Sequence, residues 1–154
     1  MQGARDMRND PVIVAVKLHH PDAKVPRLAN QGDVAFDLYS VEDVTLKPGQ
    51  WHAVATGISL EISPGYEGQV RPRSGLALKH GVTVLNAPGT IDSGYRGEVK
   101  SIMINHGKEP FKITKGMRIS QLAIRAVPKA LFEAVDDLEE SERGEGGFGS
   151  TGMK

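Results

Sequence analysis

The sequence predicts an all-β domain with a sandwich or barrel architecture. Short runs rich in β-branched residues recur along the chain, and turns containing glycine or proline separate them at intervals of roughly ten residues. Helical periodicity is weak, and the 154 residues fit a single domain. Aromatic residues make up only 5% of the chain, so the core is expected to consist mainly of aliphatic side chains. A core of that kind would gain stability from oligomerisation.

The expected strands in the first half of the chain lie between recognisable turns. The run at 12–18 is β-branched and too short for a helix. The run at 33–40 alternates apolar with polar side chains, which is the pattern of a half-buried strand. The run at 51–62 follows the turn KPGQ and precedes the turn SPGYEG, so it is expected to be a third strand.

The second half is expected to add five strands and little helix. These strands lie at 69–73, 81–86, 97–105, 111–114 and 117–127. Between the first two, residues 74–81 predict one or two helical turns, with Ser74 as the N-cap and Gly81 as the stop. The segment 131–142 has a helical composition, but it follows Pro128, so a strand leading into an acidic loop is the alternative.

The chain divides into a tail, a β domain and an arm. Residues 1–10 are polar and aperiodic and are expected to form a disordered N-terminal tail. Residues 11–142 form the β domain, which no shift in composition interrupts. After Glu142 the composition turns to glycine, serine and threonine, so residues 143–154 are expected to be a flexible C-terminal arm.

The composition excludes several classes of function. The formal net charge is zero, so no global field attracts nucleic acid or an anionic membrane. The chain has no cysteine, which excludes disulfides and thiolate metal sites, and its five histidines lack metal-ligand spacing. It also lacks an apolar run long enough to span a bilayer and the apolar core of a signal peptide. We therefore expect a cytoplasmic protein without nucleic-acid or membrane partners.

Two segments carry charges that suit a polyanionic ligand. The segment 71–81, RPRSGLALKHG, puts arginines, a serine and a glycine before a helical turn, as in a phosphate cradle. Taken alone, it is better explained as an arginine-bearing turn. Asp37 is either an exposed strand carboxylate or a carboxylate that helps to hold hydrated Mg²⁺ beside the ligand.

Two further segments carry polar residues on expected strands and their connections. Residues 83–100 predict a hairpin with a long, elaborated tip that gathers Asn86, Asp92 and Tyr95. Because long ordered loops are usually functional, this concentration favours a binding pocket. The expected strand within 115–124 carries polar residues at Arg118, Ser120 and Gln121. This last segment is the weakest signal when taken alone.

The glycine-rich end of the chain, GEGGFGSTG at 144–152, fits the pattern G-x-G-x-x-G of dinucleotide-binding proteins. Such a site needs a helix after the glycines, because the N-terminus of that helix holds the pyrophosphate. Only Met153 and Lys154 follow, and the lysine of a P-loop is missing. A dinucleotide or P-loop site is therefore rejected.

Taken in order, these segments resemble the five motifs of the homotrimeric dUTPase family. The matching stretches are VAFDLYS, RPRSGLALKHG, LNAPGTIDSGYRGEV, GMRISQLAI and RGEGGFGSTG, and the resemblance covers about residues 12–152. The second, third and fifth are highly specific in combination. The first departs from the usual pattern, because residues 34–36 replace the small residues common there. This change alters the packing near Asp37 but keeps its carboxylate.

The resemblance implies a β jelly roll or distorted barrel that assembles as a homotrimer with shared active sites. The implied reaction is the hydrolysis of dUTP to dUMP and pyrophosphate with Mg²⁺, which limits uracil in DNA and supplies dUMP for thymidylate synthesis. A dCTP deaminase, which shares the fold and needs a glutamate at the cytosine ring, is one alternative. A non-catalytic, regulatory dUTPase-like trimer is another. The stretch IDSGYRGE, with Asp92 retained, favours the hydrolase.

The resemblance also assigns roles to single residues. Asp92 is the implied base or orienting group for the water that attacks the α-phosphorus, and Asp37 is the implied contact to Mg²⁺ through water. Donors to the phosphates are Arg73, Ser74, Gly75 and Gln121. The full implied substrate-binding set is Arg73, Ser74, Gly75, Asn86, Thr90, Ile91, Asp92, Tyr95, Met103, Gln121, Arg143, Phe148, Gly149, Ser150 and Thr151.

The base and the sugar are implied to be recognised by separate groups. The hairpin around Asn86 would contact the uracil edge, and Tyr95 would pack under the deoxyribose and exclude a 2′-hydroxyl. The glycine-rich arm would be a mobile lid whose Phe148 stacks on the uracil. The arm residues implied to contact the γ-phosphate are Arg143, Ser150 and Thr151.

Overall fold

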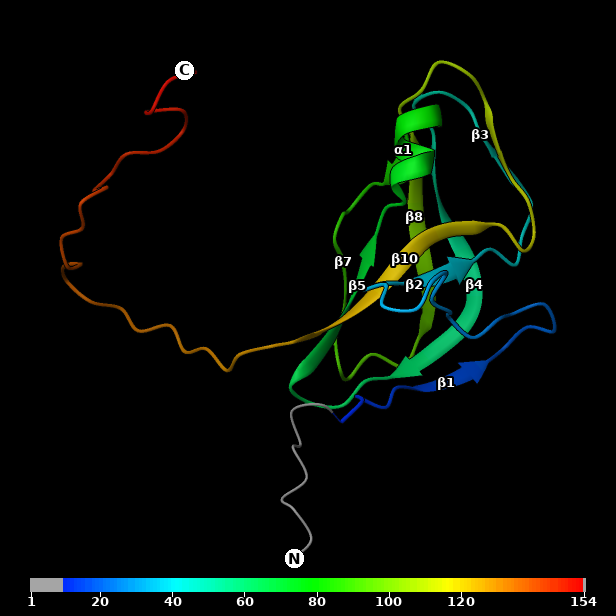
Figure 1. The fold of residues 1–154 in the computed structure, drawn as a ribbon, viewed down its shortest axis with the longest axis horizontal. Helices are drawn as coiled ribbons and strands as arrows, with labels where there is room; N and C mark the ends of the chain where they lie inside the picture. Colours follow the sequence, from blue (N-terminus) through cyan, green and yellow to red (C-terminus); the bar gives the residue numbers. More distant parts are fainter. Residues whose placement is uncertain (1–9, 154) are drawn as a thin grey trace, which may run out of the picture.

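The computed structural model describes residues 10–153, so the predicted tail at 1–10 lies, apart from Asp10, outside the described residues. The fold contains two four-stranded antiparallel sheets and a two-stranded one (Figure 1). The first sheet has the order β1 (Ala15–Leu18), β4 (Trp51–Glu61), β8 (Glu98–Asn105), β6 (Val82–Val84). The second has the order β2 (Phe36–Tyr39), β10 (Arg118–Ala126), β5 (Tyr66–Arg71), β7 (Gly89–Ile91). The small sheet pairs β3 (Val44–Leu46) with β9 (Phe111–Ile113).

One hydrophobic core joins the three sheets. Met103 contributes from the first sheet, Leu38 and Leu122 from the second, and Ile113 from the small one. Phe111 is the one aromatic residue in the buried cluster of the described chain. The predicted aliphatic core and the predicted all-β class are therefore both confirmed.

The long strand β4 bends so that it can pair with two neighbours. Its register with β8 shifts between Ala55 and Ser59, which marks an irregularity in the ladder. Gly57 lies there with a φ of +70°, and a Cβ at this position would lie 2.9 Å from the Cβ of His20. Only glycine fits both the backbone conformation and the available space.

The predicted helical turns form one short helix, α1 (Ser74–His80). Gly81 ends it in the left-handed conformation and donates its backbone N–H to the Ala77 carbonyl, as predicted. The predicted cap at Ser74 is wrong. Arg73 occupies the N-cap position without a side-chain cap, and Ser74 is the first helical residue. Arg73 is extended, with φ −91° and ψ 129°, so the helix begins one residue earlier than a cap at Ser74 implies.

Two strands were absent from the prediction, and one predicted element did not form. β3 and β7 are three-residue strands that only their partners, β9 and β5, stabilise. Residues 131–142 form neither a helix nor a strand. Their side chains, including Phe132 and Leu138, are almost fully exposed. A segment with an apolar side and nothing packed against it has little to stabilise a helix.

The chain leaves the body of the protein after β10. Val127 donates its N–H to the Gly65 carbonyl. The extended segment beyond it, which ends in the arm, runs away from the sheets (Figure 1). Almost every residue of 128–153 is exposed. Within residues 10–153, no helix is sufficiently long and apolar to cross a bilayer.

Candidate active site

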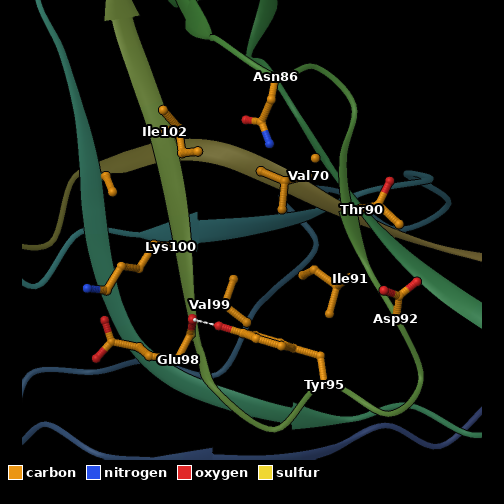
Figure 2. Close-up of a pocket in the computed structure, with 12 residues that line it drawn as sticks. Val70, Asn86, Thr90, Ile91, Asp92, Tyr95, Glu98, Val99, Lys100 and Ile102 are labelled. Carbon is orange, nitrogen blue, oxygen red and sulfur yellow. Dashed lines mark hydrogen bonds between the residues drawn. The ribbon is translucent and has the colours of Figure 1, made fainter.

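The connection between β6 and β8 builds a cavity at the edge of the sandwich. β6 and β8 pair antiparallel, which confirms the predicted hairpin, and the connection between them contains β7. β7 pairs with β5 of the second sheet, so the hairpin tip is fastened to the opposite layer. The cavity beside it has a volume of about 590 Å³ (Figure 2). Its walls come from both sheets: Ala53, Val70, Asn86, Gly89, Thr90, Ile91, Asp92, Tyr95, Glu98, Val99, Lys100 and Ile102.

Five predicted site residues meet in this cavity. Asn86, Thr90, Ile91, Asp92 and Tyr95 all line it. Asn86 points into the space between the loop and β8, and Glu98 and Lys100 lie on β8 with their charged ends turned away from the loop (Figure 2). The arrangement combines an amide, a carboxylate and an aromatic ring around a space that suits a small polar ring system.

Asn86 approaches β7 closely because Gly89 has no side chain. A Cβ at position 89 would lie 3.4 Å from Asn86 Nδ2 and 3.2 Å from the Cβ of Val70. A Cβ would therefore touch the amide at ordinary contact distance and press on Val70 of the β5 wall. Asn86 is consequently held over the cavity by the packing of β7 on β5.

Asp92 and Tyr95 are fixed by a turn at the end of β7. The Tyr95 N–H donates to the Asp92 carbonyl at 3.1 Å. The Tyr95 hydroxyl donates to the Glu98 carbonyl at 2.9 Å, so the ring reaches from the loop to the start of β8 (Figure 2). The Asp92 side chain is exposed.

Glu98, the first residue of β8, lines the cavity, although it is not among the predicted site residues. Its Oε2 is buried and has no hydrogen-bond partner among the described residues. Lys100 and Ile102 also line the cavity and were missed. Two-residue alternation along β8 from Glu98 would have indicated all three.

Met103 is a correction to the predicted set. Its side chain is 1% exposed and belongs to the core, and it does not line the cavity. Neighbouring residues on a strand face opposite sides, so Ile102 contacts the cavity where Met103 was expected.

A second group of polar residues lies at β2, β10 and the start of α1. We call it the Asp37 cluster, and its members are Asp37, Arg73, Arg118 and Gln121. Asp37 on β2 is opposite Gln121 on β10. Arg118 Nη1 lies 3.4 Å from Asp37 Oδ2, and Arg73 Nη1 donates to the Arg118 carbonyl at 2.7 Å. Asp37 is buried, so the exposed strand carboxylate considered for it is wrong. Both it and Leu38 are covered, although they face opposite sides of β2.

The remaining predicted residues lie outside the cavity. Ser74 and Gly75 are the first two residues of α1 and are exposed, with open space around the Cα of Gly75. The arm, of which residues 143–153 are described, lies away from the sheets (Figure 1), and its predicted site residues are exposed: Arg143, Phe148, Gly149, Ser150 and Thr151. Phe148 is fully exposed and has a φ of +49°. In a single chain, therefore, neither the Asp37 cluster nor the arm lines the cavity.

The donor chemistry can be compared with what a metal ion needs. Within residues 10–153, no group of three or more His, Asp or Glu side chains could hold a metal by itself. Mg²⁺ commonly keeps several waters and binds through one or two carboxylates plus substrate phosphates. The Asp37 cluster offers one carboxylate, and Gln121 is its register partner on β10, which fits an ion that keeps most of its waters.

Comparison with known proteins identifies one family and several close relatives. The family model of dUTPase matches residues 21–152. The deoxyuridine 5′-triphosphate nucleotidohydrolase of Clostridium acetobutylicum is 58% identical over 132 residues, covering 86% of this chain and 91% of the relative. The enzyme of the same description from an Anaeromyxobacter species is 53% identical over 145 residues, covering 92% and 99%.

Solved structures with a similar fold are also dUTPases. The dUTPase of Staphylococcus bacteriophage 80alpha, solved with dUPNHPP, superposes with a TM-score of 0.85 at 28% identity, covering 92% of this chain and 99% of the phage chain. The dUTPase of phage phi11 of S. aureus shares the fold at 22% identity and a TM-score of 0.76. The β sandwich is therefore an architecture that solved structures also display.

Proposed function

Because this chain belongs to the dUTPase family and is a dUTP diphosphatase, we propose that the hairpin cavity binds the deoxyuridine part of dUTP and that Asp92 directs the attacking water. The observation that carries this proposal is the meeting of Asn86, Asp92 and Tyr95 around one cavity. The reaction releases dUMP and pyrophosphate. It removes a source of uracil in DNA and supplies a precursor for thymidylate.

The base is recognised by the hairpin around Asn86. The Asn86 amide carries both a donor and an acceptor, and it lies over the cavity beside exposed loop backbone. Cytosine offers a donor where uracil offers an acceptor, so cytosine leaves a buried group unpaired, which is a large penalty. The narrow gap that Gly89 leaves between Asn86 and β5 supports rejection of the thymine methyl.

Tyr95 and Asp92 act on the sugar and the water. The ring of Tyr95, tied to the Glu98 carbonyl, forms a flat surface under the deoxyribose and leaves no room for a 2′-hydroxyl. Asp92 contacts the 3′-hydroxyl and accepts a proton from, or orients, the water that attacks the α-phosphorus. Thr90 and Ile91 complete the wall on which the sugar lies.

The Asp37 cluster and the start of α1 serve the triphosphate. Donors come from Arg73, Ser74, Gly75 and Gln121, and most phosphoryl-transfer catalysis arises from such positioning and charge compensation. Asp37 holds the waters around Mg²⁺, and its pairing with Arg118 keeps that carboxylate in place. The ion supplies positive charge on the phosphate oxygens when bound.

Three copies of the chain share each active site. In a single chain the phosphate donors and the arm do not line the cavity, which supports a site completed by groups from other copies. Trp51 supports this proposal, since its indole is 60% exposed. It lies two residues from the cavity residue Ala53, and therefore on the same side of β4. A homotrimer would cover this apolar surface.

The C-terminal arm closes the site. Its exposed Phe148 is available to stack on the uracil. Arg143, Ser150 and Thr151 contact the γ-phosphate, and the flexibility of Gly149 lets the backbone approach it. Closure excludes bulk water and strengthens these contacts.

One assay tests the proposed specificity. Hydrolysis of dUTP, dCTP, dTTP and UTP is measured in parallel, with pyrophosphate and ammonia both determined. We expect pyrophosphate from dUTP, little from the other three, and ammonia from none. Comparable cleavage of dCTP or dTTP would remove the hairpin from base selection, and ammonia from dCTP would indicate a deaminase.

A further inference from the structure

Tyr95 lies folded back over the backbone of its own loop. Its hydroxyl reaches the Glu98 carbonyl, and Gly97 is directly beneath the ring. A Cβ at position 97 would lie 2.5 Å from Tyr95 Oη, 2.6 Å from Cζ and 3.0 Å from Cε2. The first two distances are far shorter than van der Waals contact. A residue with a side chain at 97 cannot coexist with the observed ring position.

The requirement for glycine at 97 is one of space and not of backbone conformation. The φ of Gly97 lies outside the left-handed region. Gly94, three residues earlier in the same loop, also has an ordinary φ, and a Cβ there would meet no atom of the described chain within 4 Å. Of these two glycines, Gly97 alone has an aromatic ring where a Cβ would lie.

Tyr95 is held at both ends by hydrogen bonds. Glu98, whose carbonyl accepts the hydroxyl, is the first residue of β8 and pairs with Ser59 on β4. The Cα end of Tyr95 is held by the turn to Asp92. With both ends held, the ring can avoid a side chain at 97 only by breaking its hydrogen bond or by shifting the loop that carries Asp92.

We infer that Gly97 is a positioning residue for sugar selection, which acts by leaving the notch in which the Tyr95 ring lies. This inference rests on the proposed role of Tyr95 under the deoxyribose. With the notch filled, the ring would leave the cavity floor, and the space for a 2′-hydroxyl would open. Discrimination between dUTP and UTP would fall because of a residue that touches neither nucleotide.

The first test measures the ring position without any substrate. The chain has three tyrosines, so 3-fluorotyrosine labelling gives a simple ¹⁹F NMR spectrum, and Tyr95→Phe assigns the Tyr95 signal. We expect Gly97→Ala to move the Tyr95 signal and to leave those of Tyr39 and Tyr66 in place. Gly94→Ala, the matched control, should move none of the three. An unmoved Tyr95 signal in folded Gly97→Ala protein would overturn the inference.

The second test is a double-mutant cycle read as the ratio of kcat/KM for dUTP to that for UTP. Gly97→Ala should lower this ratio about tenfold or more, since a displacement near 1 Å can cost about a hundredfold in rate. In a Tyr95→Ala background, Gly97→Ala should have no further effect. An equal effect in both backgrounds would refute the inference.

The outcomes separate the inference from the proposed function. If Tyr95→Ala leaves the ratio unchanged, the sugar-selection role fails, while the ¹⁹F shift still reports on the notch. If Gly97→Ala unfolds the protein, the same cycle is read in Tm, where Tyr95→Ala must restore stability by removing the clash. A melting temperature that Tyr95→Ala does not restore would then contradict the inference.

Discussion

Asp37 and Arg118 pair a buried carboxylate with a half-exposed guanidinium across β2 and β10. Arg118 Nη1 lies 3.4 Å from Asp37 Oδ2, and the two side chains are 47% and 6% exposed, respectively. Arg73 donates to the backbone carbonyl of the same Arg118. The orientation of Arg73, a proposed phosphate donor, therefore depends on Arg118, whose guanidinium neutralises the buried Asp37.

Removing the guanidinium should destabilise the fold. Arg118→Met leaves Asp37 buried without its charged partner, and we expect a loss of about 1–3 kcal/mol in the free energy of unfolding. Urea denaturation measures it. Arg125→Met on the same strand is the control, because Arg125 is exposed and has no ion pair among the described residues. Equal stability of the two variants would contradict the prediction.

Asp92→Asn should retain the fold and nucleotide binding but lose most turnover. The amide is nearly isosteric with the carboxylate and cannot accept the proton of the water. Loss of a general base typically lowers the rate by about 10²–10⁴-fold. Calorimetric titration with dUTP and single-turnover kinetics measure the two effects separately. Near-normal turnover in the variant would remove Asp92 from this role.

Tyr95→Ala should increase the use of UTP relative to dUTP. The cavity loses its aromatic floor, so a 2′-hydroxyl gains space. The relevant measurement is the kcat/KM of both nucleotides for the wild-type protein and the variant. If the wild-type protein already cleaves UTP and dUTP alike, sugar selection by Tyr95 is wrong.

Deletion of residues 143–154 should preserve assembly and the melting temperature while greatly lowering turnover. The hydrogen bonds of the arm stay within residues 141–152, such as that from Arg143 Nε to the Gly146 carbonyl at 2.8 Å, so its removal costs the sheets little. Phe148→Ala should have a milder effect of the same kind. Undiminished dUTP hydrolysis by the truncated protein would mean that the arm is only a tail.

The active protein should be a trimer in solution. Light scattering should give about three times the 16.6 kDa mass of one chain. Trp51 is the only tryptophan, so its fluorescence reports on its surroundings, and we expect little quenching by iodide in the assembled protein. A monomer mass in an active preparation would contradict the trimer, whereas strong quenching in a trimer would contradict only the part assigned to Trp51.

The strands with clear two-residue alternation or β-branched runs were predictable because their pattern is local. The run at 51–62 became β4, and that at 97–105 became β8. β7 lies in the Pro- and Gly-rich tip of the hairpin, and its strand conformation depends on pairing with β5, which no local pattern reveals. Residues 131–142 form no helix for the same reason, because nothing in the described chain packs against them despite their helical composition.

The candidate site was predictable to the extent that it lies in one loop. Asn86, Asp92 and Tyr95 are close in sequence, and they line one cavity. Asp37 is buried because other parts of the chain cover β2. The alternation of residues within the strand does not predict this covering. The notch at Gly97 is invisible in sequence, because it is defined by where the ring of another residue lies.

The attachment of the hairpin tip to both layers links the stability of the fold to its ligand. The cavity walls include β5 of one sheet and β8 of the other, and β7 holds the tip against β5. A nucleotide that touches both walls binds the folded sandwich and has no site on an unfolded chain. By mass action, its binding free energy adds to the work needed to unfold the protein. A rising nucleotide pool would therefore protect the enzyme from denaturation and proteolysis, in step with the demand for it.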